Sequence, residues 1–331
     1  MKTAKILRYL WFAIFALLIV SGGCNWFGGK SPQQKPTPGQ TPKPGSQQQQ
    51  SAATQSEPEI TVYMHETGEK RKMKLEEYLT GVVAGEMKPE WPVNALAAQA
   101  IIARSFTLHE IETKGGVPER GTQASTDIKE FQAYSAQAIN DNIKKAVEMT
   151  RGMILTYQGK PINAWFHASA GGITATAKEG LNYQEAEPPY IRSVQSPDDL
   201  APADVKHWTA VFTKQEVLAA LAKIGKSVNR LDSLAIGEKG PSGRVTTLKV
   251  NGQETVSGPN LRVALDSMKL KSMLLDKVEV SGNKVFFSGK GYGHGVGMSQ
   301  WGANKMAVDG KKPEEIAQYY FKDVKIEKRW K

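Results

Sequence analysis

An alanine-rich helical pattern behind a proline-punctuated corner constrains the fold of this chain more than any other feature. Apolar residues recur at helical spacing over residues 75–86, which predicts a short helix that ends before Pro89. The segment ALAAQAIIARSFTL then predicts a second helix to about His109, with Pro92 as its first residue or Asn94 as its cap. Because small side chains let a helix approach its neighbours closely, we expect this second helix to be buried.

Three polar residues interrupt these two helices. Glu86 falls at the end of the first, where partial desolvation would raise the pKa of its carboxyl group and keep a proton available for acid catalysis. Arg104 lies among apolar neighbours, so its guanidinium group either reaches solvent or meets a buried acceptor. Gln99 lies on an adjacent face, and its amide group likewise needs either solvent or a buried partner. The simplest interpretation is that Gln99 and Arg104 tie the helix to a facing loop.

The fold class that these patterns predict is α+β, with mixed helices and antiparallel strands. Strand-like runs begin at Ile60, cover residues 153–169 around a turn and recur in SGRVTTLKVNG, while a last helix is expected from Pro313. A chain of 331 residues with 40% hydrophobic content supports a real core. No internal linker or repeat is evident in residues 59–331, which are therefore predicted to form one large catalytic domain, undivided or with two lobes.

Residues 1–24 have the composition of an export signal. A basic start is followed by an apolar run and then by small residues before Cys24, the only cysteine. This order resembles a bacterial lipoprotein signal, in which that cysteine is lipidated and becomes the mature N-terminus. An uncleaved membrane anchor is the alternative, since apolar residues continue through Phe27 and a spanning helix needs about 20 residues. Either interpretation places the remaining chain at the outer face of the cytoplasmic membrane, in the cell-wall space.

Residues 25–58 are rich in proline and glutamine and carry almost no apolar side chains after Phe27. This composition predicts a disordered tether that lets the domain reach a target away from the membrane. The formal net charge of +10 would ordinarily suggest nucleic acid, but an exported chain meets anionic polymers of the envelope instead. The sequence contains no basic run with interleaved aromatic residues, so we expect no nucleic-acid partner.

The run before a glycine pair predicts a strand with two different faces. Between residues 162 and 169, apolar side chains alternate with a second set, which is Asn163, Trp165, His167 and Ser169. We therefore expect one apolar face and one polar and aromatic face. The strand ends at Gly171 and Gly172, where the backbone can turn sharply or approach a ligand. Residues 185–204 are proline-rich and acidic, which predicts a long surface excursion.

A glycine-rich segment, GKGYGHGVGMSQWGANKMAVDG, is the last strong feature. Its glycines occupy alternate positions from 289 to 297, so an extended backbone would have one bare face, open to close backbone approach, and would carry His294 on the other. No register supplies the glycine spacing of a dinucleotide fingerprint, so nucleotide binding is unsupported. His294 is either a base or a structural histidine.

The residue types present favour chemistry with a single acid. The five histidines form no pair at helical spacing and no cluster with cysteine, so neither zinc nor another cofactor is expected. The surroundings of Ser169, A-S-A-G, differ from a nucleophile elbow, which disfavours a serine hydrolase. Most glycosidases need a second carboxylate, but nothing in the sequence pairs Asp127, the nearest by context, with Glu86. A reaction with one acid/base fits better, such as attack by a sugar hydroxyl on its own anomeric carbon.

Four blocks of sequence, taken together, resemble the stage II sporulation protein D and amidase-enhancer family of cell-wall proteins. They are GVVAGEMKPEWPVNALAAQAIIARSF, FQAY, FHASAGG and GYGHGVGMSQWGANKMA, in the family's order. The resemblance implies a lytic transglycosylase that cleaves between N-acetylmuramic acid and N-acetylglucosamine in glycan strands stripped of stem peptides, and leaves an anhydromuramic end. It implies peptidoglycan as the partner and Glu86 as the catalytic acid/base.

The same resemblance assigns further residues to substrate binding or orientation. They are Gln99, Arg104, Gln132, Tyr134, Ser169, Gly171, Gly172, His294, Gly295, Gly297, Ser299 and Gln300. Some members carry a zinc site before the Gln-x-Tyr element, but here that segment is ASTDIKEFQAY, so the resemblance implies no metal.

The family's second name provides an alternative function, a non-enzymatic, wall-bound enhancer of an N-acetylmuramoyl-L-alanine amidase. A pure wall-binding module is disfavoured, because it would not need a carboxylate and an arginine in apolar helical surroundings.

Overall fold

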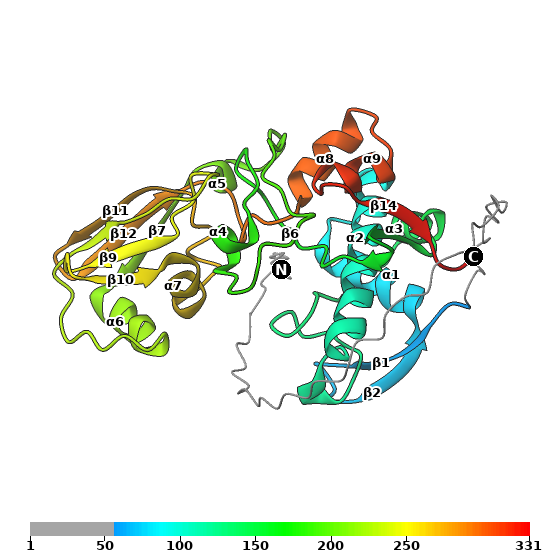
Figure 1. Ribbon diagram of the computed structural model, residues 1–331, viewed down its shortest axis with the longest axis horizontal. Helices are drawn as coiled ribbons and strands as arrows, with labels where there is room; N and C mark the ends of the chain where they lie inside the picture. Colours follow the sequence, from blue (N-terminus) through cyan, green and yellow to red (C-terminus); the bar gives the residue numbers. More distant parts are fainter. Residues whose placement is uncertain (1–55) are drawn as a thin grey trace, which may run out of the picture.

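The structure is a computed structural model and describes residues 56–331 (Figure 1). The predicted signal of residues 1–24, with Cys24, and most of the predicted tether lie outside the described residues. Helices and mostly antiparallel strands in small sheets confirm the predicted α+β class. Within residues 56–331, no helix is long and apolar enough to cross a membrane.

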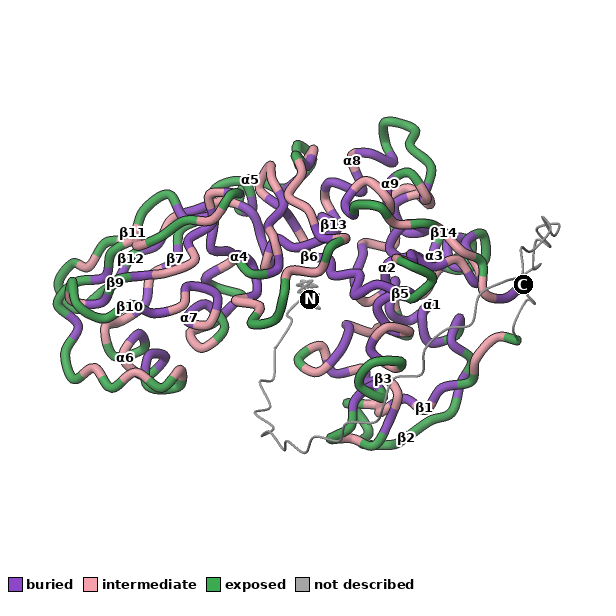
Figure 2. The backbone as a smooth tube through the Cα atoms, viewed as in Figure 1, coloured by how far each residue is buried: buried purple, intermediate pink, exposed green. Residues whose placement is uncertain are grey.

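A long central helix, α2, organises the first lobe. α2 (Val93–Lys114) packs against α1 (Leu75–Glu86), α3 (Asp141–Met149), α8 (Gln300–Val308) and α9 (Pro313–Tyr319). Every alanine of α2 is fully buried. Figure 2 shows most of this helix in the colour of buried residues. The small side chains thus let four helices surround one, and the expected burial of this helix is confirmed.

Two small sheets complete the first lobe. In one, β1 (Glu59–Tyr63) lies between antiparallel β2 (Lys70–Lys74) and parallel β3 (Ala124–Ser125), which follows the short 3-10 helix η1 (Pro118–Arg120). In the other, β4 (Met153–Tyr157) lies between antiparallel β5 (Lys160–Pro161) and β14 (Lys325–Lys328). The β4–β14 pairing brings segments far apart in the sequence side by side.

A second lobe has its own hydrophobic cluster and contains two antiparallel three-stranded sheets. β12 (Lys284–Gly289) lies between β11 (Leu275–Ser281) and β7 (Trp208–Thr213), and β9 (Thr247–Val250) lies between β8 (Leu234–Ile236) and β10 (Glu254–Ser257). The helices α6 (Lys214–Lys223) and α7 (Gly258–Leu265) pack beside these sheets. Val285 and Phe287 of β12 are buried whereas Phe286 between them is exposed, as the two-residue period of a strand requires.

Two segments distant in the sequence meet between the lobes (Figure 2). β6 (Phe166–His167) pairs in parallel with β13 (Met298–Ser299), and α4 (Ala177–Leu181) and α5 (Ala203–Lys206) belong to the same region. This pairing sets the FHASAGG block beside the glycine-rich block.

The predicted start and end of the central helix were wrong by a few residues. Pro92 occupies the cap position before Val93, and the Asn94 side chain donates to the carbonyl oxygen of Lys311 at 2.9 Å instead of capping the helix. The helix continues to Lys114, where Gly115 adopts a left-handed φ of 76° and its N–H closes the last turn.

The predicted two-faced strand over residues 162–169 was also wrong. Only Phe166 and His167 form a strand, and residues of both alternating sets, such as Ala164 and Trp165, are buried. The segment passes through the interior beside the glycine-rich block, so no face of it is left for solvent.

The glycine-rich segment does not take the extended form considered from its sequence. Gly291, Gly293, Gly295 and Gly297 all have positive φ, between 72° and 106°, so the chain turns at every second residue. The predicted close approach is confirmed, because a Cβ atom on Gly297 would lie 1.9 Å from the carbonyl oxygen of Trp165.

Candidate functional site

Glu86 is the last residue of α1 and lies almost buried, with 8% of its surface exposed. Its Oε1 accepts a hydrogen bond from the Ala133 N–H at 2.7 Å, and its Oε2 lies 3.5 Å from Nε2 of Gln300. Burial raises the pKa of the Glu86 carboxyl group to about 8, although these two hydrogen bonds lower it in part. The partial negative charge at the C-terminal end of a helix acts in the same direction as burial. Glu86 therefore carries a proton at neutral pH.

Two glycines on α1 let the Gln-x-Tyr element reach Glu86. A Cβ atom on Gly81 would lie 2.0 Å from the ring of Tyr134, and one on Gly85 would lie 2.6 Å from the backbone nitrogen of Tyr134. The chain at Ala133 thus passes directly over the helix, and its N–H reaches the carboxyl group of Glu86. The glycine spacing of four residues on the first predicted helix was the sequence signal for this contact.

Gln132 and Tyr134 flank that contact in different ways. Gln132 is fully buried, and its Nε2 donates to Oγ1 of Thr107 at 2.9 Å, which ties the element to α2. Tyr134 is half-buried and stacks on Tyr78, with ring centroids 6.1 Å apart. Tyr134 therefore places a partly exposed aromatic ring next to Ala133, whose N–H binds Glu86.

The glycine-rich block supplies the opposite side of the site through Ser299 and Gln300. Ser299 caps α8, since its Oγ accepts from the N–H of Gly302 at 3.2 Å. Gln300 is the first residue of that helix, which directs its amide toward Glu86. The structure thus brings the Glu-Met, Gln-x-Tyr and glycine-rich blocks together around one carboxyl group.

Asp198, which the sequence reasoning missed, connects Ser169 and Ser299. Its two carboxylate oxygens accept from Oγ of Ser169 at 2.6 Å, from Oγ of Ser299 at 2.9 Å and from the N–H of Gly171 at 3.0 Å. Asp198 is 8% exposed, so the prediction of a surface excursion over residues 185–204 was wrong here. No local pattern marks this aspartate, because its partners lie far from it in the sequence.

Arg104 meets a buried acceptor, and that acceptor is Glu76. Its Nη2 and Nε donate to the two carboxylate oxygens of Glu76 at 2.6 and 3.0 Å, and its Nη1 donates to the carbonyl oxygen of Met153 at 2.8 Å. Glu76 also accepts from the N–H of Gly152 and from Nε1 of Trp330. These contacts agree with the simplest interpretation, that Arg104 ties α2 to facing segments.

Gln99 is the second polar residue of α2 and is fully buried. Neither its amide oxygen nor its amide nitrogen has a hydrogen-bond partner among the described residues. Its predicted role in orienting the acid or the sugar stays a prediction.

His294 lies beside His167, with ring centroids 5.6 Å apart, and its Nδ1 accepts from the N–H of Val296 at 3.1 Å. Burial, followed by the positive charges of Arg262 and Arg244, lowers the pKa of His294 to about 3. Burial also holds the pKa of His167 well below its ordinary value. Both rings are therefore neutral at ordinary pH, and His294 fits the structural interpretation better than that of a base.

The glycines assigned to the site shape the backbone around a buried arginine. Gly171 and Gly172 have φ values of 66° and 106°, and a Cβ atom on Gly295 would lie 2.4 Å from the guanidinium carbon of Arg244. Arg244 donates to the carbonyl oxygens of Ala170 and Ile173 at 2.7 and 2.8 Å. The missing side chain of Gly295 thus leaves room for an arginine of the second lobe at the junction between the lobes.

No second carboxylate accompanies Glu86 within hydrogen-bonding distance in the described part of the chain. Asp127 instead lies 3.2 Å from Nδ1 of His65 and accepts from the N–H of Lys129. Across residues 56–331 there is also no group of three or more His, Cys, Asp or Glu side chains that could hold a metal ion.

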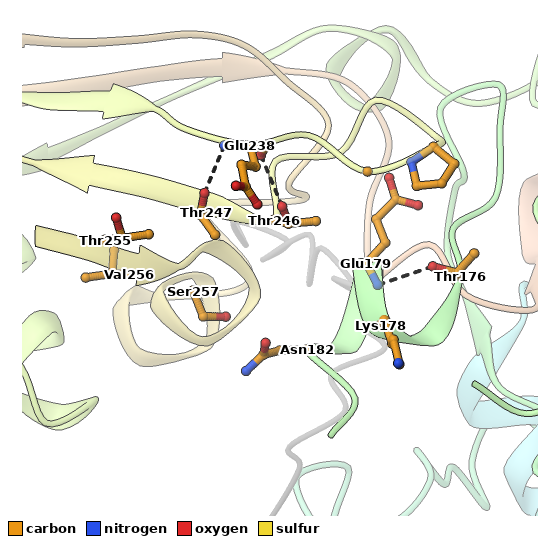
Figure 3. A pocket seen from close by; sticks show the side chains of 12 residues that line it. Thr176, Lys178, Glu179, Asn182, Glu238, Thr246, Thr247, Thr255, Val256 and Ser257 are labelled. Carbon is orange, nitrogen blue, oxygen red and sulfur yellow. Dashed lines mark hydrogen bonds between the residues drawn. The ribbon is translucent and has the colours of Figure 1, made fainter. Parts of the chain in front are cut away.

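A separate pocket of about 400 Å³ opens between α4 and the second lobe (Figure 3). It is lined by hydroxyl and charged side chains of two regions, which include Thr176, Lys178, Glu179, Asn182, Glu238, Thr246, Thr247, Thr255 and Ser257. Glu179 is engaged in the structure, because its Oε1 accepts from the hydroxyl and N–H groups of Ser242. Glu86 is not among the residues of this pocket.

Comparisons with known proteins match both lobes. The sequence model of the stage II sporulation protein family matches residues 63–157, and that of a domain of unknown function matches residues 182–297. The chain is similar to stage II sporulation protein D of Bacillus subtilis, with 32% identity over 98% of this chain and 94% of that protein. It is 32% identical to an uncharacterized protein of Brachyspira hyodysenteriae over 77% of this chain and 67% of that protein. The amidase enhancer of Bacillus subtilis is 28% identical over 73% of this chain and 39% of that protein.

Proposed function

We propose a catalytic role in the cell wall for this protein, which belongs to the stage II sporulation protein D and amidase-enhancer family. In this proposal it is a lytic transglycosylase that cleaves between N-acetylmuramic acid and N-acetylglucosamine in peptide-stripped glycan strands. The observation that carries the proposal is the buried Glu86 carboxyl group, whose raised pKa keeps it protonated at neutral pH.

Glu86 acts first as an acid and then as a base. Its proton passes to the glycosidic oxygen, the bond from that oxygen to the anomeric carbon of the muramic acid breaks, and N-acetylglucosamine leaves with a hydroxyl group. The Ala133 N–H and the Gln300 amide stabilise the resulting carboxylate. The 6-hydroxyl group of the muramic acid then attacks its own anomeric carbon and returns its proton to Glu86. The anhydro ring closes without consuming water, so one carboxyl group suffices.

Replacement of the acid tests this proposal. We expect Glu86→Gln to fold and to bind glycan but to release no anhydro-ended fragments from peptide-stripped strands, as measured by mass spectrometry of the soluble products. Glu90→Gln is the matched control, because Glu90 is exposed in the same corner, and it should give the wild-type product yield. Unchanged product yield from Glu86→Gln would contradict the proposal.

A second candidate function, stimulation of an N-acetylmuramoyl-L-alanine amidase, is favoured by the similarity to the amidase enhancer. In that case the purified protein alone solubilises no wall material, yet it accelerates a partner amidase. Because this activity needs no acid, it should persist in Glu86→Gln, which separates the two candidates.

For its place of action we propose the outer face of the cytoplasmic membrane, with the chain held by a lipid on Cys24 or by an uncleaved helix in residues 1–24. The apolar run before a single cysteine supports an anchor there. Metabolic labelling with a radioactive fatty acid distinguishes the two anchors, since Cys24→Ser loses the label only if that cysteine is lipidated.

A further inference from the structure

A lysine and two tryptophans cluster at the corner that follows Glu86. Nζ of Lys88 lies 5.1 Å from the ring centroid of Trp301, and the rings of Trp301 and Trp91 are 4.6 Å apart. All three side chains are partly exposed. An ammonium group over an indole face is attracted by the ring, which holds the long lysine side chain in place.

This cluster adjoins the acid from two directions along the chain. Lys88 comes two residues after Glu86, in a turn closed by the hydrogen bond from the Trp91 N–H to the Lys88 carbonyl oxygen at 3.0 Å. Trp301 directly follows Gln300, whose amide lies 3.5 Å from the Glu86 carboxyl group. The corner and the start of α8 therefore bring one cation and two aromatic rings to the edge of the same site.

Lys88 has no carboxylate within ion-pair distance among residues 56–331, so its ammonium group has no internal counter-ion there. Glu90 follows it in the same turn, but no ion pair joins the two. An amine positioned on an aromatic ring and left without an internal counter-ion is suited to bind an anionic group of a ligand.

We propose that Lys88, resting on Trp301, binds the free lactyl carboxylate of N-acetylmuramic acid and thereby selects peptide-stripped glycan. This inference rests on the proposed function and adds the group that recognises the substrate. Removal of the stem peptide converts a neutral amide on the lactyl group into a carboxylate, so a single ammonium group discriminates between the two strands. The faces of Trp91 and Trp301 provide apolar surface on which a sugar ring can stack.

Binding is measured separately from catalysis to test this subsite. The protein is Glu86→Gln, which cannot turn over, and the two ligands are a soluble tetrasaccharide of peptide-stripped glycan and the same tetrasaccharide with its carboxylates converted to methylamides. Isothermal titration calorimetry should show roughly ten- to hundredfold tighter binding of the free acid, the range for a hydrogen bond between charged groups.

Lys88→Met in this background should weaken binding of the free acid to the level of the methylamide and leave methylamide binding unchanged. Lys88→Arg should restore the preference in part, because it keeps the charge. Lys311→Met removes an exposed lysine from the loop between α8 and α9 and should retain the full preference, which controls for net charge.

A preference that survives in Lys88→Met, or no binding of either ligand by Glu86→Gln, overturns the subsite. Failure of the proposed function is recognised differently, by the absence of anhydro-ended products when the wild-type protein acts on the free acid.

Discussion

Glu86 derives its raised pKa from desolvation and not from a neighbouring negative charge. An acid with a pKa of about 8 is protonated over most of the physiological range and still gives up its proton readily when a basic oxygen approaches. The Ala133 N–H hydrogen bond holds the carboxyl group in a fixed position for that transfer.

The activity of the free enzyme should therefore fall as pH rises through about 8, since only the protonated form of Glu86 can act as the acid. The measurement is kcat/KM for release of anhydro-ended products across pH 6–10. Glu90→Gln, which changes an exposed carboxyl group in the same corner, is the control and should give the wild-type pH profile. A constant rate across that range would show that Glu86 is not the titrating acid.

The raised pKa of Glu86 also predicts how the free energy of unfolding depends on pH. The pKa of Glu86 rises from 4.5 to about 8 on folding, so between these values the unfolded chain has lost the proton and the folded protein retains it. The free energy of unfolding thus contains a contribution that is fully present below pH 4.5 and falls as pH rises to about 8, by on the order of 5 kcal/mol.

Glu86→Gln removes this titration, so the variant should gain stability relative to wild type as pH rises from 5 to 8. Urea unfolding at the two pH values measures the difference. A Glu86→Gln difference that stays the same at the two pH values would contradict the raised pKa of Glu86.

Among the elements, α1 depends on two glycines that a helix would ordinarily disfavour. Gly81→Ala should gain about 1 kcal/mol from helix propensity. The added Cβ atom would instead lie 2.0 Å from the Tyr134 ring, so we expect a net loss of about 1–3 kcal/mol and lower activity as Ala133 is displaced. Urea unfolding and product yield measure the two effects.

A double-mutant cycle isolates this contact. In a Tyr134→Ala background the clash is absent, so Gly81→Ala should become neutral or stabilising. An equal loss in both backgrounds would mean that the glycine serves some other contact.

The buried pair between α1 and α2 is the second element-scale prediction. Arg104→Met leaves the Glu76 carboxylate buried without its cation, which should cost about 3–5 kcal/mol in urea unfolding. Arg71→Met breaks an exposed pair with Glu69 and should cost about 0–1 kcal/mol. Arg104 bonds Glu76 and not Glu86, so the folded Arg104→Met protein should keep its activity at low temperature. Loss of activity without loss of stability would instead support a role of Arg104 in orienting the acid or the substrate.

Sequence patterns predicted the parts of this fold whose cause is local. Helical periodicity located α1, most of α2 and α9, and the four sequence blocks contain Glu86, Tyr134 and Gln300, which the structure brings close together. The Asp198 cluster and the partner of Arg104 were not predictable, because they arise from pairings between distant segments. The turns of the glycine-rich segment were not predictable either, since alternate glycines permit positive φ as readily as extension.

At the scale of the whole molecule, Arg244 links the second lobe to residues 170–173 at the junction between the lobes. It leaves the second lobe to donate to the carbonyl oxygens of Ala170 and Ile173, and its own N–H donates to Glu179 at 3.2 Å. Burial lowers its pKa to about 10, so it remains charged at neutral pH. One side chain from the second lobe thus satisfies two backbone carbonyl groups in residues 170–173.

Arg244→Met should uncouple the lobes, because it leaves both carbonyl groups buried without a donor. Differential scanning calorimetry is expected to show one transition for the wild type and two for the variant, with Lys226→Met, which breaks an exposed pair inside the second lobe, as the control. A single transition at a lower temperature would mean that the lobes unfold together without Arg244.

The hydrogen bond from Trp330 to Glu76 has a consequence for vectorial folding. In the first lobe, β4 pairs with β14 and Glu76 accepts a hydrogen bond from Trp330, so both need residues 325–330. The hydrophobic cluster of the second lobe is made by strands and helices within residues 208–289. As the chain is synthesised, the lobe made later should therefore mature first. Ribosome-stalled chains that expose residues up to 300 should yield a protease-resistant fragment from the second lobe while α1 and α2 are digested, and equal resistance of the two lobes would contradict this order.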